Sequence, residues 1–156
     1  MKTITVDSRR NAAAQAGRSE IERRLHADAL QIAVPLQTVI RTTAVLKIAA
    51  AMCEGLNWSV RLLDVQVVPA RCGMDSPPID RNFSETRLRS LADAIQAPVS
   101  GILVYSRDWE AGLFHALTPE SLVVLAVRKR IWKTVEERLA ERLRAQGHQV
   151  ILVECK

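Results

Sequence analysis

Five short apolar runs, each followed by a stretch with helical spacing or by the end of the domain, constrain the fold of this chain most strongly. The runs cover 30–35, 60–68, 99–105, 122–127 and 150–153, and the helical stretches cover 38–56, 80–96, 108–117 and 131–146. Mostly apolar strands that alternate with amphipathic helices are typical of a parallel sheet covered on both faces. We therefore predict an α/β fold with a single open, doubly wound parallel five-stranded sheet flanked by helices.

The predicted topology also places the ligand end of the sheet. Open α/β sheets bind ligands beyond the carboxyl ends of their strands, where the strand order reverses. In this chain those ends fall near Pro35–Gln37, Val68–Pro69, Ser106–Asp108 and Val127–Arg130. Side chains at these four points are the first candidates for a binding site.

The length of 156 residues suits one domain. Residues 1–27 are polar, charged and alanine-rich, and they predict a flexible arm before a domain over 28–156. The first 24 residues have no apolar core like that of a signal peptide, and no apolar run approaches the roughly 20 residues that span a bilayer. We expect a cytoplasmic protein with no membrane insertion.

Several local strings resemble the universal stress protein family. Ile32–Pro35 is similar to its first strand, Ala49–Pro69 to its first helix and second strand, Tyr105–Ala111 to the turn after its third strand, and Leu122–Ala126 to its fourth strand. Together they cover roughly Leu30 to Glu154. The resemblance implies a Rossmann-like fold of the adenine-nucleotide alpha hydrolase type and a role in stress response.

Family members that bind ATP carry a glycine-rich loop after the fourth strand, whose amides approach the phosphates. Ala126 and Lys129 stand at the first two glycine positions here, and Leu139 lies near the third. Gln37 replaces the acid that follows the first strand. These departures argue against ATP or AMP held in the family's way, and we expect no cofactor.

The resemblance nevertheless implies eight positions that would line a ligand site. They are Pro35, Gln37, Val67, Val68, Ala126, Arg128, Lys129 and Arg130. The basic run 128–130 supports two interpretations: a side-chain site for a small anion, or a solvated loop balanced by Glu136 and Glu137. The sequence leaves both open.

No residue pattern in the chain indicates catalysis or a metal site. Asp64 falls inside a predicted strand, where it is either inward and paired or at an edge. Asp108 and Glu110 lack an adjacent nucleophile or metal, and Ser106 has no evident histidine partner. The three cysteines and three histidines are scattered, without ligand spacing. We expect no enzyme and no resident metal.

The final strand, Val150, Ile151, Leu152 and Val153, should lie at a sheet edge and offer a dimer interface. The resemblance also implies dimerisation through this strand. The leading hypothesis is a non-catalytic stress-protein-like module that dimerises and binds a protein partner or a small anion. The alternatives are an ATP- or AMP-binding switch or slow ATPase with a rebuilt basic loop, and a regulatory domain linked to membrane transport.

The net charge of +5 and the pI of about 9.6 raise nucleic acid as a further partner, through the arginine-rich arm. The basic residues of the domain alternate with acids, as in Glu136–Arg138. Such interleaving is typical of a solvated helix face. The pattern therefore argues against a nucleic-acid surface.

Overall fold

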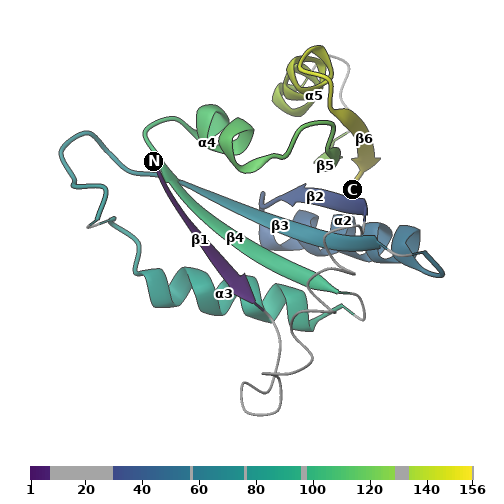
Figure 1. Cartoon of the computed structure of the whole chain (residues 1–156), viewed down its shortest axis with the longest axis horizontal. Helices are drawn as coiled ribbons and strands as arrows, with labels where there is room; N and C mark the ends of the chain where they lie inside the picture. Colours follow the sequence, from purple (N-terminus) through teal and green to yellow (C-terminus); the bar gives the residue numbers. More distant parts are fainter. Residues whose placement is uncertain (8–29, 57, 76, 96–97, 129–133, 156) are drawn as a thin grey trace.

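Six strands pair into one sheet in the order β1-β4-β3-β2-β5-β6 (Figure 1). The computed structural model describes residues 1–7, 30–56, 58–75, 77–95, 98–128 and 134–155. The strands are β1 (Lys2–Asp7), β2 (Leu30–Pro35), β3 (Trp58–Val67), β4 (Val99–Ser106), β5 (Leu122–Val127) and β6 (Gln149–Glu154). Strands β2 to β6 are the five predicted from the sequence, and all their pairings are parallel.

The sixth strand, β1, corrects the predicted boundary between arm and domain. It pairs antiparallel with β4, with Lys2 opposite Tyr105 and Asp7 opposite Ser100. The side chain of Ile4 in β1 packs against the core. Lys2 of the same strand forms an ion pair of 2.7 Å with Asp75. The consecutive β-branched residues at 3–6 favour a strand here. Residues 2–7 thus belong to the sheet, and the rest of the predicted arm, 8–27, lies outside the described residues.

In the part of the chain that the structure describes, four helices cover the two faces of the sheet (Figure 1). They are α2 (Val39–Cys53), α3 (Arg81–Asp93), α4 (Trp109–Ala116) and α5 (Val135–Ala145). Helices α2 and α3 lie on one face, and α4 and α5 lie on the other. Each begins after a Thr or Asp side chain that accepts a hydrogen bond from a first-turn amide, which is the usual way to satisfy a helix start.

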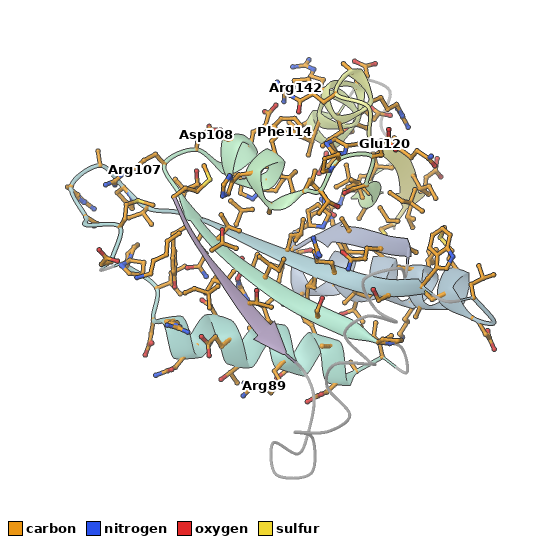
Figure 2. The ribbon with its side chains drawn as sticks, in the orientation of Figure 1. Arg89, Arg107, Asp108, Phe114, Glu120 and Arg142 are labelled. Carbon is orange, nitrogen blue, oxygen red and sulfur yellow. The ribbon has the colours of Figure 1, made fainter. Side chains whose placement is uncertain are left out.

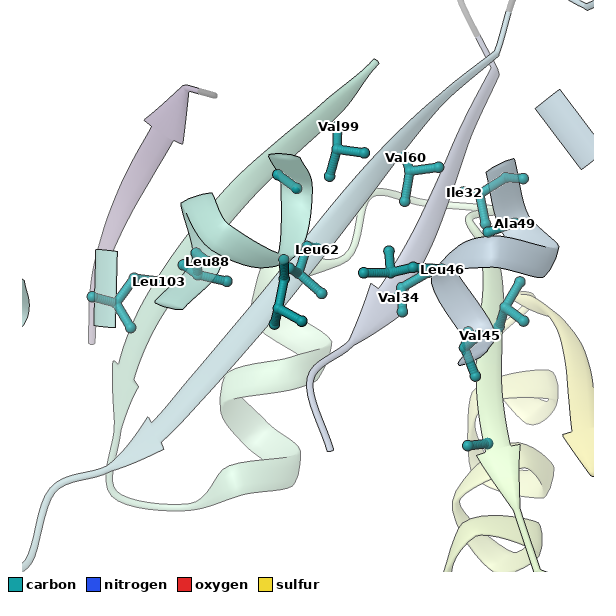
Figure 3. Close-up of a cluster of buried hydrophobic side chains, with 14 of the residues drawn as sticks. Ile32, Val34, Val45, Leu46, Ala49, Val60, Leu62, Leu88, Val99 and Leu103 are labelled. Carbon is teal, nitrogen blue, oxygen red and sulfur yellow. The ribbon is translucent and has the colours of Figure 1, made fainter. Parts of the chain in front are cut away.

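Two apolar clusters fill the spaces between the sheet and its helices. Ile32, Leu62 and Leu103 face α2 and α3, where they meet Leu46 and Leu88 (Figure 3). On the opposite face, the cluster consists of residues such as Leu63, Val104, Leu113, Leu125 and Leu143. Successive residues of one strand enter different clusters, which explains why the strands are apolar throughout rather than alternating.

Gly112 lets α4 approach the sheet closely. A Cβ atom built at this position would lie 2.6 Å from Cγ1 of Val65 and 2.9 Å from Cβ of Ser106. Both distances are shorter than a side chain can accept, so the backbone of α4 rests directly on β3 and β4. This contact positions the turn that follows β4, where Arg107 and Asp108 are found (Figure 2).

Within the described parts of the chain, we find no helix with the length and apolar character needed to cross a membrane.

Candidate functional site

The strand order reverses between β2 and β5. From β2 the chain proceeds through β3 to β4, and it then returns to the other side of β2 to form β5 and β6. The carboxyl ends of β2 and β5 are therefore the position where an α/β sheet of this kind would hold a ligand. Pro35, Gln37, Ala126 and Arg128 were predicted to lie here, and the structure brings the ends of both strands to this point.

Strands β2 and β5 separate before they reach their carboxyl ends. Their parallel register contains only Ile32 with Leu122 and Ala33 with Val123. On the other side of β2, the pairing with β3 continues to Pro35. Past Ala33 and Val123 the two central strands therefore leave main-chain groups without a neighbouring strand.

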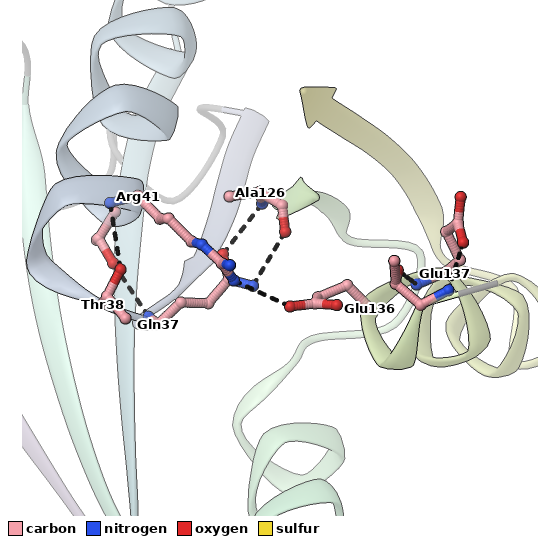
Figure 4. A network of polar contacts seen from close by, with 8 residues as sticks. Gln37, Thr38, Arg41, Ala126, Glu136 and Glu137 are labelled. Carbon is pink, nitrogen blue, oxygen red and sulfur yellow. Dashed lines mark hydrogen bonds and ion pairs between the residues drawn. The ribbon is translucent and has the colours of Figure 1, made fainter. Parts of the chain in front are cut away.

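The side chain of Gln37 occupies this opening (Figure 4). Its Nε2 donates to the carbonyl oxygen of Ala126 at 3.1 Å, and its Oε1 accepts from the amide of Ala126 at 3.1 Å. The amide group thus replaces a strand neighbour for Ala126, which is fully buried. Since the Ala126 amide is bound to Gln37, it is not presented to a ligand in this conformation.

A second bridge lies beside the first and joins two helices. Arg41 in the first turn of α2 forms an ion pair with Glu136 in the first turn of α5, at 3.1 Å between Nη1 and Oε1. The two side chains are 20% and 24% exposed, so water screens this pair less than it screens a surface pair. Gln37 and Arg41 together connect the β2–α2 half of the site to the β5–α5 half (Figure 4).

The start of α5 differs from the sequence-based prediction. The helix was expected from Ile131, but it begins at Val135, and residues 131–133 lie outside the described residues. Thr134 and Glu137 form a capping box, in which each side chain bonds the backbone amide of the other residue. Glu136 and Glu137 also place negative charge at this helix start, where it is favourable.

The other predicted ligand positions have diverse environments. Pro35 and Val68 are buried, while Val67 is 48% exposed. Both valines lie beside β4, where the Val68 amide donates to the carbonyl of Ser106, and not beside β5. Arg128 is exposed after β5. Lys129 and Arg130 lie outside the described residues, so the basic run is only partly placed.

The polar side chains after β4 have structural partners. Arg107 donates hydrogen bonds to the carbonyls of Val68, Pro69 and Cys72, and so holds the loop that follows β3. Asp108 caps α4 through the amide of Ala111 at 2.7 Å. These structural contacts explain the presence of Arg107 and Asp108 in this turn without a catalytic role for either residue.

The remaining catalytic candidates lie apart or are paired. Glu110 forms an ion pair of 2.7 Å with Arg142 of α5. Ser106 is buried and accepts a hydrogen bond from the Asp108 amide, whereas His115 is exposed. Among the described residues, no group of three His, Cys, Asp or Glu side chains could hold a metal ion. Burial raises the pKa of the Cys53 thiol, which disfavours the reactive thiolate.

A polar cluster that the sequence did not predict lies beneath α3. Asp64 of β3 is 3% exposed and forms an ion pair of 2.6 Å with Arg87 of α3. The same carboxylate oxygen accepts from Nε2 of Gln66 at 3.3 Å, and this nitrogen also donates to Oγ of Ser84 at 2.5 Å. Asp64 is thus inward and paired, which was one of the two alternatives drawn from the sequence.

The structure is similar to that of a universal stress protein from Archaeoglobus fulgidus, with a TM-score of 0.54. The match covers 79% of this chain and 92% of that chain, at 15% sequence identity. The chain has the universal stress protein fold. Identity this low shows the fold alone. A scan against models of protein families finds no match, and no curated protein sequence matches the chain.

Within the universal stress protein fold, the structure confirms the resemblance drawn from the sequence at the level of architecture. It also places β6 at the edge of the sheet, next to β5 alone, as expected. The sequence did not predict the hydrogen bonds of Gln37 with Ala126 or the ion pair of Arg41 with Glu136, because the partners are about 90 residues apart in the chain. No local pattern carries information about such pairs.

Proposed function

We propose that this chain is a non-catalytic, stress-protein-like module that associates through β6 and binds a partner, without a nucleotide cofactor. The observation that carries the proposal is the double bridge of Gln37 with Ala126 and of Arg41 with Glu136. Both bridges lie where the strand order reverses, which is the usual ligand position of such a sheet.

The bridges compete with a nucleotide in two ways. A phosphate at the end of β5 would need free backbone amides, but the amide of Ala126 already donates to Gln37. A phosphate near the start of α5 would also meet the carboxylates of Glu136 and Glu137. Neighbouring negative charges disfavour an anion. Binding to the Ala126 amide would therefore require the bridge from Gln37 to break first.

The edge of β6 supports self-association. The amide of Gln149 donates to the carbonyl of Ser121, directly before β5, and the amide of Cys155 donates to the carbonyl of Val127 at the end of β5. Because hydrogen bonding alternates along a parallel strand, the main-chain groups of Val150, Leu152 and Glu154 face away from β5. The Val150 carbonyl accepts from Arg144, but no described strand pairs with this side of β6 in the sheet. Such an apolar edge favours pairing with a second copy. A twofold dimer would pair the two edges.

Exposed apolar side chains beside the bridges support a protein partner. Ile40 precedes Arg41 and is 82% exposed, and Val135 precedes Glu136 and is 74% exposed. Exposed apolar side chains that form a contiguous patch mark protein contact surfaces. We infer that the bridged end of the sheet contacts a protein.

A second candidate function is an anion-dependent switch that uses ATP or AMP. It is favoured by Arg128, an exposed cation that directly follows the carboxyl end of β5. A guanidinium can hold a phosphate without help from backbone amides. The two functions differ in one measurable property, the stabilisation of the folded protein by nucleotide.

The deciding experiment is a thermal melt of the full chain with ATP, AMP, inorganic phosphate or no ligand. A ligand present at 100 times its Kd and bound only by the folded state would stabilise by about 2.7 kcal/mol. We expect no shift with any of the three. A shift with ATP that is lost in Arg128→Ala would replace the proposal by the switch.

Self-association is tested separately by analytical ultracentrifugation. We expect a dimer that Leu152→Pro abolishes, because proline removes an outward-facing amide without breaking a bond to β5. Leu152→Ala is the matched control, since it shortens the same side chain but keeps the amide. A monomeric wild-type protein, or equal dissociation of both variants, would contradict pairing through this edge.

A further inference from the structure

Three buried polar atoms without a partner gather in the cluster beneath α3. Within the described residues, four buried side-chain nitrogen or oxygen atoms make no hydrogen bond. Three of them belong to this cluster: Oε1 of Gln66, Nε of Arg87 and the hydroxyl of Tyr105. Buried polar groups in folded proteins nearly always have a partner. Their concentration at one place requires an explanation.

The three residues are neighbours in the structure. Gln66 and Tyr105 are opposite each other in the parallel register of β3 and β4, so their side chains share the face under α3. Gln66 and Arg87 are joined through Asp64, because Nε2 of one and Nη2 of the other donate to the same carboxylate oxygen. Gln66 is 7% exposed and Tyr105 is 2% exposed.

The hydrogen-bond network determines which amide atom of Gln66 is left over. Asp64 can only accept, so the atom that faces its carboxylate must be the nitrogen. Oγ of Ser84 donates to the carbonyl of Asp80, so it accepts from the same nitrogen. The unpartnered atom of Gln66 is therefore Oε1, an acceptor.

The unpartnered atoms match the capacity of a single hydroxyl group. Tyr105 O–H and Arg87 Nε–H are donors, and Gln66 Oε1 is an acceptor. A hydroxyl oxygen accepts two hydrogen bonds and donates one, and a water molecule can do the same. Buried waters make about three hydrogen bonds on average, to groups such as these.

Charge argues for a neutral occupant. The guanidinium of Arg87 is already neutralised by Asp64, and the nearby Arg81 is paired with Glu85 at 2.5 Å. An anion would find no uncompensated positive charge in these pairs, and a cation would face two donors. An uncharged hydroxyl has neither cost.

Access to the cluster runs along Arg87. Its side chain is 28% exposed, and its guanidinium lies 6.0 Å from the ring centre of Phe83, which is itself 61% exposed. The outer side of the cluster is thus formed by two side chains near the protein surface.

We propose that Gln66, Arg87 and Tyr105 form an internal binding site for one uncharged hydroxyl group, beneath α3. A water molecule and the hydroxyl of a small alcohol share this chemistry. The occupant accepts from Tyr105 and Arg87 and donates to Gln66. This site lies on the face of α2 and α3 and is separate from the bridges between β2 and β5.

The first test uses Tyr105, the single tyrosine of the chain. The tyrosine Fermi doublet in the ultraviolet resonance Raman spectrum reports whether a phenol is hydrogen bonded. We expect the doublet of a bonded phenol in the folded full chain. The doublet of a free phenol would overturn the proposal.

The second test is the stability of Tyr105→Phe, which removes one oxygen and keeps the ring. If the hydroxyl is bonded, its loss should lower the ratio of folded to unfolded protein by about fivefold. If it is an unpaired buried group, its removal should leave the ratio unchanged or raise it. The second result contradicts the site whatever the spectrum shows.

The source of the hydroxyl is distinguished by two further measurements. A high-resolution crystal structure should place one oxygen atom within hydrogen-bond distance of all three side chains. In solution, titration with ethanol is followed on the NMR signal of Arg87 Nε–H. A saturable shift that Tyr105→Phe abolishes identifies an alcohol site, and no shift identifies a resident water. No oxygen in the crystal structure would refute both.

Discussion

The side-chain amide of Gln37 pairs with both main-chain groups of Ala126, at 3.1 Å each, and so acts as a one-residue strand between β2 and β5. Sheets of this kind normally leave that position open for a ligand. In this chain a side chain closes it.

Replacing Gln37 should therefore cost stability. In Gln37→Ala the buried amide and carbonyl of Ala126 lose both partners, and we expect the free energy of unfolding to fall by about 1–3 kcal/mol. Urea denaturation followed by circular dichroism measures the change. Gln149→Ala, at an exposed glutamine of β6, is the control and should stay within about 0.5 kcal/mol of the wild type. Equal stability of the two variants would show that the bridge does not form in solution.

Arg144 should weaken the dimer that we propose. Its Nη2 donates to the carbonyl of Val150 at 2.9 Å, and this carbonyl faces outward at the sheet edge. The side chain thus occupies a group that a second copy would use. We expect Arg144→Ala to lower the dimer dissociation constant severalfold in sedimentation equilibrium. The control is Arg138→Ala, which removes one exposed positive charge from the same helix. A similar gain in both would assign the effect to net charge.

Gly112→Ala should destabilise the fold through a steric clash. The added methyl group would lie 2.6 Å from Val65 and 2.9 Å from Ser106, so α4 would have to move away from the sheet. Forcing extra volume into a packed contact typically costs about 1–3 kcal/mol. Gly73→Ala is the matched control, because a Cβ there has no neighbour within 4 Å. Thermal denaturation of both variants checks the prediction, which fails if they melt together.

Tyr105 should titrate at higher pH in the folded protein than in the unfolded chain. Burial raises the pKa of its phenol, and the carboxylates of Asp64, Glu85 and Asp80 add to the rise against the opposing charge of Arg81. The absorbance of tyrosinate measures this residue alone, because the chain has one tyrosine. We expect a midpoint above that of the same protein in denaturant.

The sign of the linked stability follows from this shift. Above the unfolded pKa of about 10, the unfolded chain releases the phenolic proton while the folded protein retains it. The contribution of Tyr105 to stability is therefore complete below that pH and is lost as the pH rises through the folded pKa. Tyr105→Phe should remove this part of the pH dependence. An unchanged alkaline profile would contradict the burial of the phenol.

The sequence predicted β2 to β6 and the four helices because their periodicity is local. Strand β1 was not predicted, since its sequence combines two threonines and charged ends with only two apolar residues, of which Ile4 packs against the core. The late start of α5 could have been predicted, because Thr134 and Glu137 have the spacing of a capping box. An edge strand with only one face against the core has a much weaker pattern of apolar residues than a strand buried on both faces.

The sequence predicted where β2 and β5 end, but not the contacts that side chains make there. The position of Gln37 at the end of β2 follows from the strand pattern. The sequence also showed that Gln37 stands where the resembled family has an acidic residue. Its pairing with Ala126 depends on how far β2 and β5 diverge, which is a property of the assembled sheet. The polar cluster was equally hidden, since Asp64 was visible in an apolar run but its partner Arg87 comes from a helix.

The antiparallel pairing of β1 also sets an order of events during folding. Lys2 is opposite Tyr105, so the first strand to be synthesised has no partner until β4 has been made. Closing so long a loop is slow compared with forming the neighbouring strand–helix–strand units. We expect β2 and β3 to be structured before β1 joins the sheet, and residues 2–7 to wait without a strand partner while the ribosome adds about a hundred residues.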